Sequence, residues 1–190
     1  MPSKPRHLLS GRDMAYSIIP LVLICLVLAG ASRACSFSPG GPQAAPPVAV
    51  DAAASLTANA RTVDFPVRLP GLPGGWTANS GSVTTVPGAA GGTVIATGWI
   101  SPAGRYLRLA QSDASPDALR AEQLDGDRTP TSAEDLAGTS WTIFTATGSE
   151  TAWVADLGTV RLLITGSGTD QEFRTLAIST TTADPLPGRD

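Results

Sequence analysis

An uncharged apolar run near the N-terminus places the strongest constraint on how this chain folds. The run reads MAYSIIPLVLICLVLAGA and spans Met14–Ala31. As a helix that rises 1.5 Å per residue, it covers roughly 27 Å, close to the ~30 Å hydrocarbon core of a bilayer. The run therefore predicts a single N-terminal transmembrane helix.

The charges before this run predict its orientation. Lys4, Arg6 and Arg12 precede it, and Asp13 is the one acidic residue on that side. Basic flanks stay in the cytoplasm. We therefore expect residues 1–13 to be cytoplasmic and the chain after the span to be extracytoplasmic, at the plasma membrane.

Three fates of the apolar run remain open. An uncleaved signal anchor is the interpretation that we favour. A cleaved signal peptide is the second, because AGA at Ala29–Ala31 fits the small-x-small pattern before a cleavage point. A lipoprotein with Cys35 lipidated is the third, although Arg33 interrupts the expected pattern before that cysteine. All three place the remainder of the chain outside the cytoplasm.

Composition after the run predicts where the folded domain lies. Residues 32–60 are rich in Pro, Ala and Gly, so they bury too little surface to offset their ordering entropy and are expected to form a linker. Residues 61–180 are the stretch expected to bury a core, as an extracytoplasmic α+β domain. Residues 181–190 are expected to form a loose tail.

A repeated pattern predicts the architecture of this domain. TGWISPAGRYLRLAQS at Thr97–Ser112 and TAWVADLGTVRLLITG at Thr151–Gly166 align at an offset of 54 residues. The same offset aligns Trp99 with Trp153 and Arg120 with Arg174. Both copies read as strand, glycine turn, strand, loop and helix. The fold class expected is α+β, with internally duplicated antiparallel β units each followed by a helix.

Turn and cap residues predict the individual elements. Two hairpins are expected, 93–100 with 105–111 and 150–155 with 159–165. Alternation of apolar residues in the last strand favours a sheet with one covered face. Ser115 before Pro116 predicts one helix start, and Thr169 with Glu172 forms a capping-box pattern for another. Residues 125–138 are expected to be a turn-rich acidic connection between the halves.

Missing side-chain types exclude several kinds of chemistry. The chain has one histidine, His7, and no cysteine after Cys35. A Ser-His-Asp or Cys-His nucleophile in the outer domain is thereby excluded, and so is the usual zinc site. From Arg33 onward there are 10 arginines and 15 acidic residues. Such a negative domain repels phosphate backbones, so nucleic acid is not an expected partner.

The remaining candidates each have a structural and a functional interpretation. Asp113, Asp117, Asp125 and Asp127 could bind calcium, and Glu134 with Asp135 could act as acid and base, but a solvated connection explains these carboxylates better. The tryptophans could line a ligand surface, but core packing is favoured; they are Trp76, Trp99, Trp141 and Trp153.

Two further candidates are weighed in the same way. Arg105 and Arg108 beside Tyr106 could contact an acidic partner, although a solvated sheet face is favoured. The amides of GSGTD at 166–170 could hold an anion, although an N-cap loop is favoured. We assign no catalytic, cofactor-binding or metal residue, and we expect no cofactor.

Three motifs carry a family resemblance. They are VDFPVRLPGLPGGWTANS at 63–80, GWISPAGRYLRLAQSDAS at 98–115 and TVRLLITGSGTDQEFRTLA at 159–177. With the basic start and apolar run, the chain resembles actinobacterial proteins grouped as domain-of-unknown-function family 4245, over roughly residues 8–180. The resemblance implies a membrane-anchored outer domain and no assigned activity.

The expected function is that of a non-enzymatic binding or interaction module of the cell envelope. The alternatives are a carrier or sensor of an apolar ligand such as a lipid, and a carboxylate-dependent hydrolase. The expected partners are the membrane and an envelope protein or lipid. The sequence leaves open the ligand, the oligomeric state and whether the two halves share one sheet.

Overall fold

The computed structural model describes residues 16, 18–25, 27, 49–126, 128–145 and 150–189. The chain divides into two units, Met1–Ala45 and Pro46–Asp190. In the first unit the described residues are helical, and their apolar side chains are exposed. Across the described residues, no helix has both the length and the apolar character that a bilayer crossing requires. The predicted span Met14–Ala31 lies partly, and linker residues 32–48 wholly, outside the described residues, so both stay predictions.

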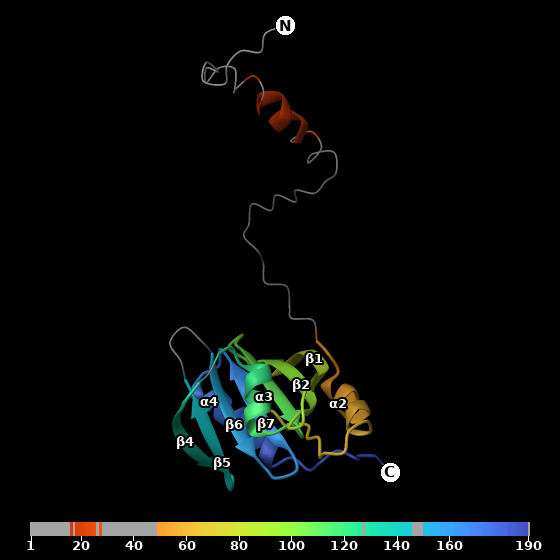
Figure 1. Ribbon diagram of the computed structural model, residues 1–190, viewed down its shortest axis with the longest axis vertical. Coiled ribbons are helices and arrows are strands. Elements are labelled where there is room, and N and C mark those ends of the chain that lie inside the picture. The colour runs from red at the N-terminus through yellow and green to blue at the C-terminus, as the bar shows by residue number, and fades with distance from the viewer. Residues whose placement is uncertain are drawn as a thin grey trace. The chain divides into compact units, whose positions relative to one another are not determined.

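A seven-stranded antiparallel sheet forms the centre of the second unit (Figure 1). Its strand order is β1-β2-β3-β7-β6-β5-β4, so the two halves share one sheet and meet where β3 pairs with β7. The α+β class is confirmed. The strands are β1 (Thr77–Val86), β2 (Gly92–Ile100), β3 (Tyr106–Ser112), β4 (Pro130–Leu136), β5 (Thr139–Phe144), β6 (Thr151–Asp156) and β7 (Arg161–Gly166).

Both predicted hairpins are confirmed, but they pair in different registers. Leu109 of β3 pairs with Thr97, whereas Leu163 of β7 pairs with Val154. The offset is therefore 54 residues between β3 and β7 and 57 residues between β2 and β6. The predicted equivalence of Trp99 and Trp153 is wrong, because a tryptophan match in sequence does not fix the register of a hairpin.

The two helices after the hairpins begin where the caps predicted. α3 (Pro116–Gln123) starts after Ser115, whose side chain accepts the amide of Ala118. α4 (Asp170–Thr181) starts after Thr169 with a complete capping box. Capping satisfies amides that the first helical turn leaves without partners.

These two helices cover opposite faces of the sheet. Leu107, Leu109 and Ile164 lie in one apolar cluster with Phe173 and Leu176 of α4. The other cluster holds Leu119 of α3 with Ala110 and Leu163. Successive side chains of a strand point to opposite faces. The prediction of one covered face is therefore wrong, and the residues of β7 from Leu162 to Ile164 are buried on both sides.

The predicted domain start at residue 61 is also wrong. Residues 52–60 form α2 (Ala52–Ala60), with Asp51 as N-cap accepting the Ala54 amide at 2.9 Å. Leu56 and Ala60 are buried in the α4-side cluster. Alanine is a strong helix former, and its small side chain permits close packing on the sheet. The Pro, Ala and Gly content predicted a linker, because composition takes no account of the N-cap at Asp51 or of the sheet surface on which the helix packs.

Two further segments are ordered against expectation. The connection 125–138 contributes edge strand β4, which turns into β5 through Ala137 and Gly138, both at positive φ. The tail docks on the domain, because the Leu186 amide donates to the Val67 carbonyl at 2.8 Å. β4 forms because its backbone pairs with β5 across this turn, and the tail is ordered because it pairs with the distant segment around Arg68.

Candidate functional site

Two hollows flank the end of the sheet formed by β4, β5 and β6. The first, here called the α4 pocket, encloses about 430 Å³ and is lined by Ser132, Ala133, Glu134, Ile143, Thr145, Thr151, Trp153, Asp170 and Arg174. The second, here called the α3 groove, encloses about 460 Å³ and is lined by Pro116, Asp117, Arg120, Pro130, Ser140, Thr142, Phe144, Val154 and Asp156. Since they involve α4 and α3, they lie on opposite faces of the sheet.

An arginine–carboxylate pair forms one wall of the α4 pocket. Arg174 Nε donates to Glu134 Oε1 at 2.6 Å, and its Nη2 donates to Oε2 at 3.2 Å. The hydrogen bond with Glu134 raises the pKa of Arg174 above its ordinary value. This fork fixes the guanidinium in one plane, with its remaining N–H groups available to a ligand. Trp153 contributes an aromatic floor and stacks on Phe173 with centroids 5.5 Å apart.

The α3 groove combines an apolar floor with a positioned guanidinium. Arg120 lies over the ring of Phe144, 4.7 Å from its centroid. Its Nη2 donates to Asp117 Oδ1 at 2.7 Å. Val154 continues the floor, and Thr142 adds a hydroxyl. This arrangement suits an apolar side chain flanked by polar backbone, because both apolar and hydrogen-bonding groups line the groove.

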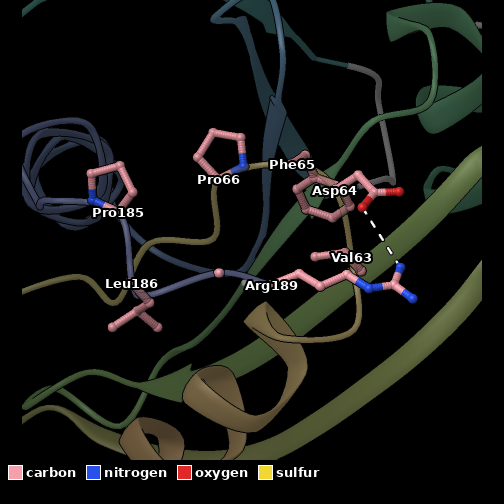
Figure 2. Close-up of a pocket in the computed structure, with 8 residues that line it drawn as sticks. Val63, Asp64, Phe65, Pro66, Pro185, Leu186 and Arg189 are labelled. Atoms are coloured by element: carbon pink, nitrogen blue, oxygen red, sulfur yellow. Dashed lines mark ion pairs between the residues drawn. The ribbon is translucent and has the colours of Figure 1, made fainter.

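A third hollow lies where the C-terminal tail meets the segment after α2. It encloses about 330 Å³, and Figure 2 shows Arg189 reaching toward Asp64 across it. The two side chains are exposed and 3.8 Å apart. Exposed ion pairs contribute little because water competes for both charges. This hollow follows from tail docking and offers no fixed polar group.

Among the described carboxylates, Glu172 is the one whose pKa is clearly changed. Its burial favours the neutral form, but hydrogen bonds from Ser101, Thr169 and Arg105 outweigh this and lower its pKa to about 2. Arg105 Nε lies 2.9 Å from Glu172 Oε2. The contacts tie the β2–β3 turn to the start of α4. Arg105, a candidate for partner binding, makes this contact within the chain, and its role toward a partner stays a prediction.

Two of the candidate calcium ligands, Asp113 and Asp117, are engaged by contacts within the chain. Asp113 accepts the Thr93 amide at 2.8 Å, and Asp117 pairs with Arg120. Asp127 lies outside the described residues. Within the part of the chain that the structure describes, no three acidic, histidine or cysteine side chains are grouped as metal ligands would be.

The proposed acid–base pair of Glu134 and Asp135 is contradicted by geometry. Glu134 pairs with Trp141 across the strands, and Asp135 pairs with Ser140. Adjacent residues of a strand point to opposite faces, so the two carboxylates cannot flank one bond. Glu134 is also engaged with Arg174.

Core packing of the tryptophans is confirmed. Trp99, Trp141 and Trp153 are buried on the α4 side, and Trp76 packs against the same cluster. Among the described residues the three buried indole N–H groups have no hydrogen-bond partner. Trp153 lines the α4 pocket.

The N-cap interpretation of 166–170 is confirmed. The Thr169 amide donates to Glu172 Oε2 at 2.7 Å, and the Glu172 amide is directed to Thr169 Oγ1. Two amides of the first turn are therefore engaged within the chain. Arg108, the other arginine considered, lies on β3 opposite Thr165.

Sequence reasoning missed Arg120, Phe144 and Arg174 as lining residues. A signal was present, because Arg120 and Arg174 align at the 54-residue offset. Each lines one hollow, and the hollows lie on opposite faces because α3 and α4 do. Nothing in the sequence identified Phe144 as the ring that Arg120 covers.

Comparison with known proteins yields a family match. A family model described as "Protein of unknown function (DUF4245)" matches residues 6–180. No curated protein and no solved structure matches the chain. The predicted family resemblance is confirmed, whereas the actinobacterial origin stays a prediction.

Proposed function

We propose, from the premise that this chain belongs to the DUF4245 family, that it is a binding module of the cell envelope. Its partner docks at the β4–β5 end of the sheet. The partner is an extended segment of an envelope protein, held by side chains rather than altered chemically.

The observation that carries this proposal is the pair of hollows on the two faces of one sheet end. Each has a guanidinium held in place, by Glu134 in the α4 pocket and by Asp117 and Phe144 in the α3 groove. Pre-positioned arginines and aromatic rings are frequent anchors of protein interfaces, because they lose little entropy on binding.

The α3 groove is the place for the anchoring side chain. Its floor of Phe144 and Val154 is apolar, and its walls carry hydroxyls and amphipathic Arg120. An apolar side chain of the partner would be buried there, and the hydroxyl groups of the groove would form hydrogen bonds with the partner's backbone. Burial of one Leu-sized side chain contributes about 1.5–3 kcal/mol.

A photo-crosslinking residue tests the site in intact cells. Placed at Thr142 it should give one discrete adduct, and placed at exposed Ala103 in the β2–β3 turn it should not. Ser140→Trp, which fills the groove, should abolish the Thr142 adduct. Thr139→Trp on the other face is the matched control and should preserve it. Equal adducts from both placements, or an adduct unaffected by Ser140→Trp, would refute docking in the groove.

An apolar ligand is the second candidate, because the same Phe144–Val154 floor suits an acyl chain. Native mass spectrometry of the protein extracted from membranes discriminates the two. A co-purifying lipid that Ser140→Trp removes would favour the carrier. Absence of lipid together with a Thr142 adduct would favour the protein partner.

We further propose that residues 14–31 anchor this module, with residues 1–13 in the cytoplasm. Support comes from the uncharged run, its basic flank and the apolar side chains exposed around the described helical residues. Alkaline extraction should leave the full chain in the membrane and release a chain that starts at Pro46. N-terminal sequencing of the mature protein distinguishes cleavage after Ala31, and Cys35→Ala tests lipidation.

Internal duplication also remains a proposal. It is supported by the common order of hairpin and helix in both halves, and by the central pairing of β3 with β7. The unequal offsets require a three-residue change in one hairpin. Self-comparison of an alignment of family members would test it, and loss of the 54-residue signal there would refute it.

A further inference from the structure

We propose that the outer edge of β1 pairs with β1 of a second copy of this chain, joining two sheets into one. β1 and β4 are the two edge strands, at opposite ends of the sheet (Figure 1). Within the described residues, one backbone hydrogen bond reaches the outer edge of β1, from Val50 to Ala78 at 2.9 Å. The rest of that edge is open to another strand.

The open part of β1 is long enough for specific pairing. A register shift lies between Ala78 and Ser80, and the pairing with β2 is regular from Ser80 to Val86. Residues 80–85 are all exposed. Such an edge presents unpaired N–H and C=O groups, which are a template for a further strand.

The two edge strands differ in charge. β1 reads TANSGSVTTV and has no charged residue, and no proline interrupts it. β4 begins at Pro130 and carries Glu134 and Asp135. Charge and proline are the usual protections of an edge against pairing. Two copies of β4 would bring acidic residues together, whereas two copies of β1 bring no like charges together.

The side chains of β1 also suit pairing with themselves. An antiparallel pair centred on Val83 sets this residue against Val83 of the second copy, and sets Ser82 against Thr84. Val83 is 49% exposed, more than Val50 at 37% or Ile178 at 39%, the other exposed large apolar residues in the described part of unit Pro46–Asp190. Cross-strand valine and hydroxyl pairs stabilise a sheet, and a two-fold axis makes each such contact twice.

This dimer is independent of the proposed docking site. The α3 groove and α4 pocket lie at the β4 end of the sheet, so pairing through β1 leaves both open. Loss of the dimer would therefore not remove the Thr142 adduct, and failure of one proposal does not imply failure of the other.

A charge design in the full chain tests the pairing. Native mass spectrometry measures the mass of the purified full chain in detergent micelles over a range of protein concentrations. The wild type should form a dimer. Ser82→Lys with Thr84→Lys should weaken dimerisation at least tenfold, because lysines then face lysines. Ser82→Glu with Thr84→Lys should restore it, because each introduced carboxylate then faces an introduced ammonium of the other copy.

Hydrogen exchange of the wild type gives a second readout that needs no variant. The amides of residues 80–86 should exchange more slowly at high protein concentration than at low concentration, and those of β4 should not. A monomeric wild type would overturn the proposal. So would an undiminished dimer of the double-lysine variant, or exchange at 80–86 that is unaffected by concentration.

Discussion

Glu172→Gln should destabilise the domain at neutral pH and have much less effect in acid. The carboxylate accepts hydrogen bonds from the Thr169 amide at 2.7 Å, the Thr169 hydroxyl at 2.9 Å and Arg105 Nε at 2.9 Å. A glutamine keeps the size of the side chain but removes the charge. The substitution therefore weakens the capping box and the tie between α4 and the β2–β3 turn.

The size of the effect follows from the pKa of Glu172, which is lowered from 4.5 to about 2. At 1.36 kcal/mol per unit this difference corresponds to ~3 kcal/mol. Arg105 is 43% exposed, so solvent screening reduces its share. We therefore expect Glu172→Gln to lower the free energy of unfolding by about 1–2 kcal/mol at pH 7.

The pH dependence has a definite sign. Because the folded pKa lies below the unfolded value, the charged carboxylate stabilises the fold fully above pH 4.5. This stabilisation is lost as the pH falls from 4.5 toward 2. The difference between wild type and Glu172→Gln should therefore shrink over that window.

Urea unfolding of a chain that starts at Pro46, followed at pH 7, 5, 4 and 3, measures this difference. Glu122→Gln, on the exposed side of α3, is the matched control and should change stability by less than ~0.5 kcal/mol. A Glu172→Gln effect that stays constant from pH 7 to pH 3 would show that the lost contacts do not depend on the carboxylate charge.

Three other predictions concern stability, each measured by urea unfolding at pH 7. Gly166→Ala should cost about 3 kcal/mol, because φ is +142° and a Cβ would lie 2.2 Å from the Tyr106 carbonyl oxygen; Gly158→Ala, also at positive φ but with open space around it, should cost only about 1 kcal/mol. Trp153→Ala should cost about 3–5 kcal/mol and Trp153→Phe clearly less, since the stacked contact with Phe173 and the buried volume are largely kept; equal losses would argue against packing as the cause. Leu56→Ala should cost about 2–4 kcal/mol because α2 is part of the core, whereas exposed Ala58→Gln on the same helix should be near neutral; a neutral Leu56→Ala would mean that α2 does not stabilise the sheet.

Local signals predicted the elements of the domain well. The Gly104 and Gly158 turns sit between paired strands, and both residues have positive φ. Ser115 and Thr169 cap the helices they were expected to cap. These features depend on interactions among a few neighbouring residues, so a short stretch of sequence is enough to predict them.

The candidate site was predicted only in part. The sequence identified Trp153 and Glu134 as candidates. It predicted Asp135 as the partner of Glu134, whereas in the structure Glu134 binds Arg174, 40 residues further along the chain. No local pattern marks Phe144, because its ring contributes to the groove through its contact with Arg120. Such contacts join strands and helices whose proximity depends on register, which no local pattern encodes.

The sequence by itself determined the kind of chain this is: an apolar run with a basic flank, hairpins with glycine turns, capped helices, and a domain without histidine or cysteine. Those properties follow from side-chain chemistry and from backbone preferences over a few residues. Only the tertiary structure decided that α2 and the tail belong to the domain, that β4 forms from an acidic connection, and that α3 and α4 take opposite faces. The positions of α2, the tail, α3 and α4 depend on burial or pairing between segments that are distant in the sequence, and β4 depends on its pairing with β5.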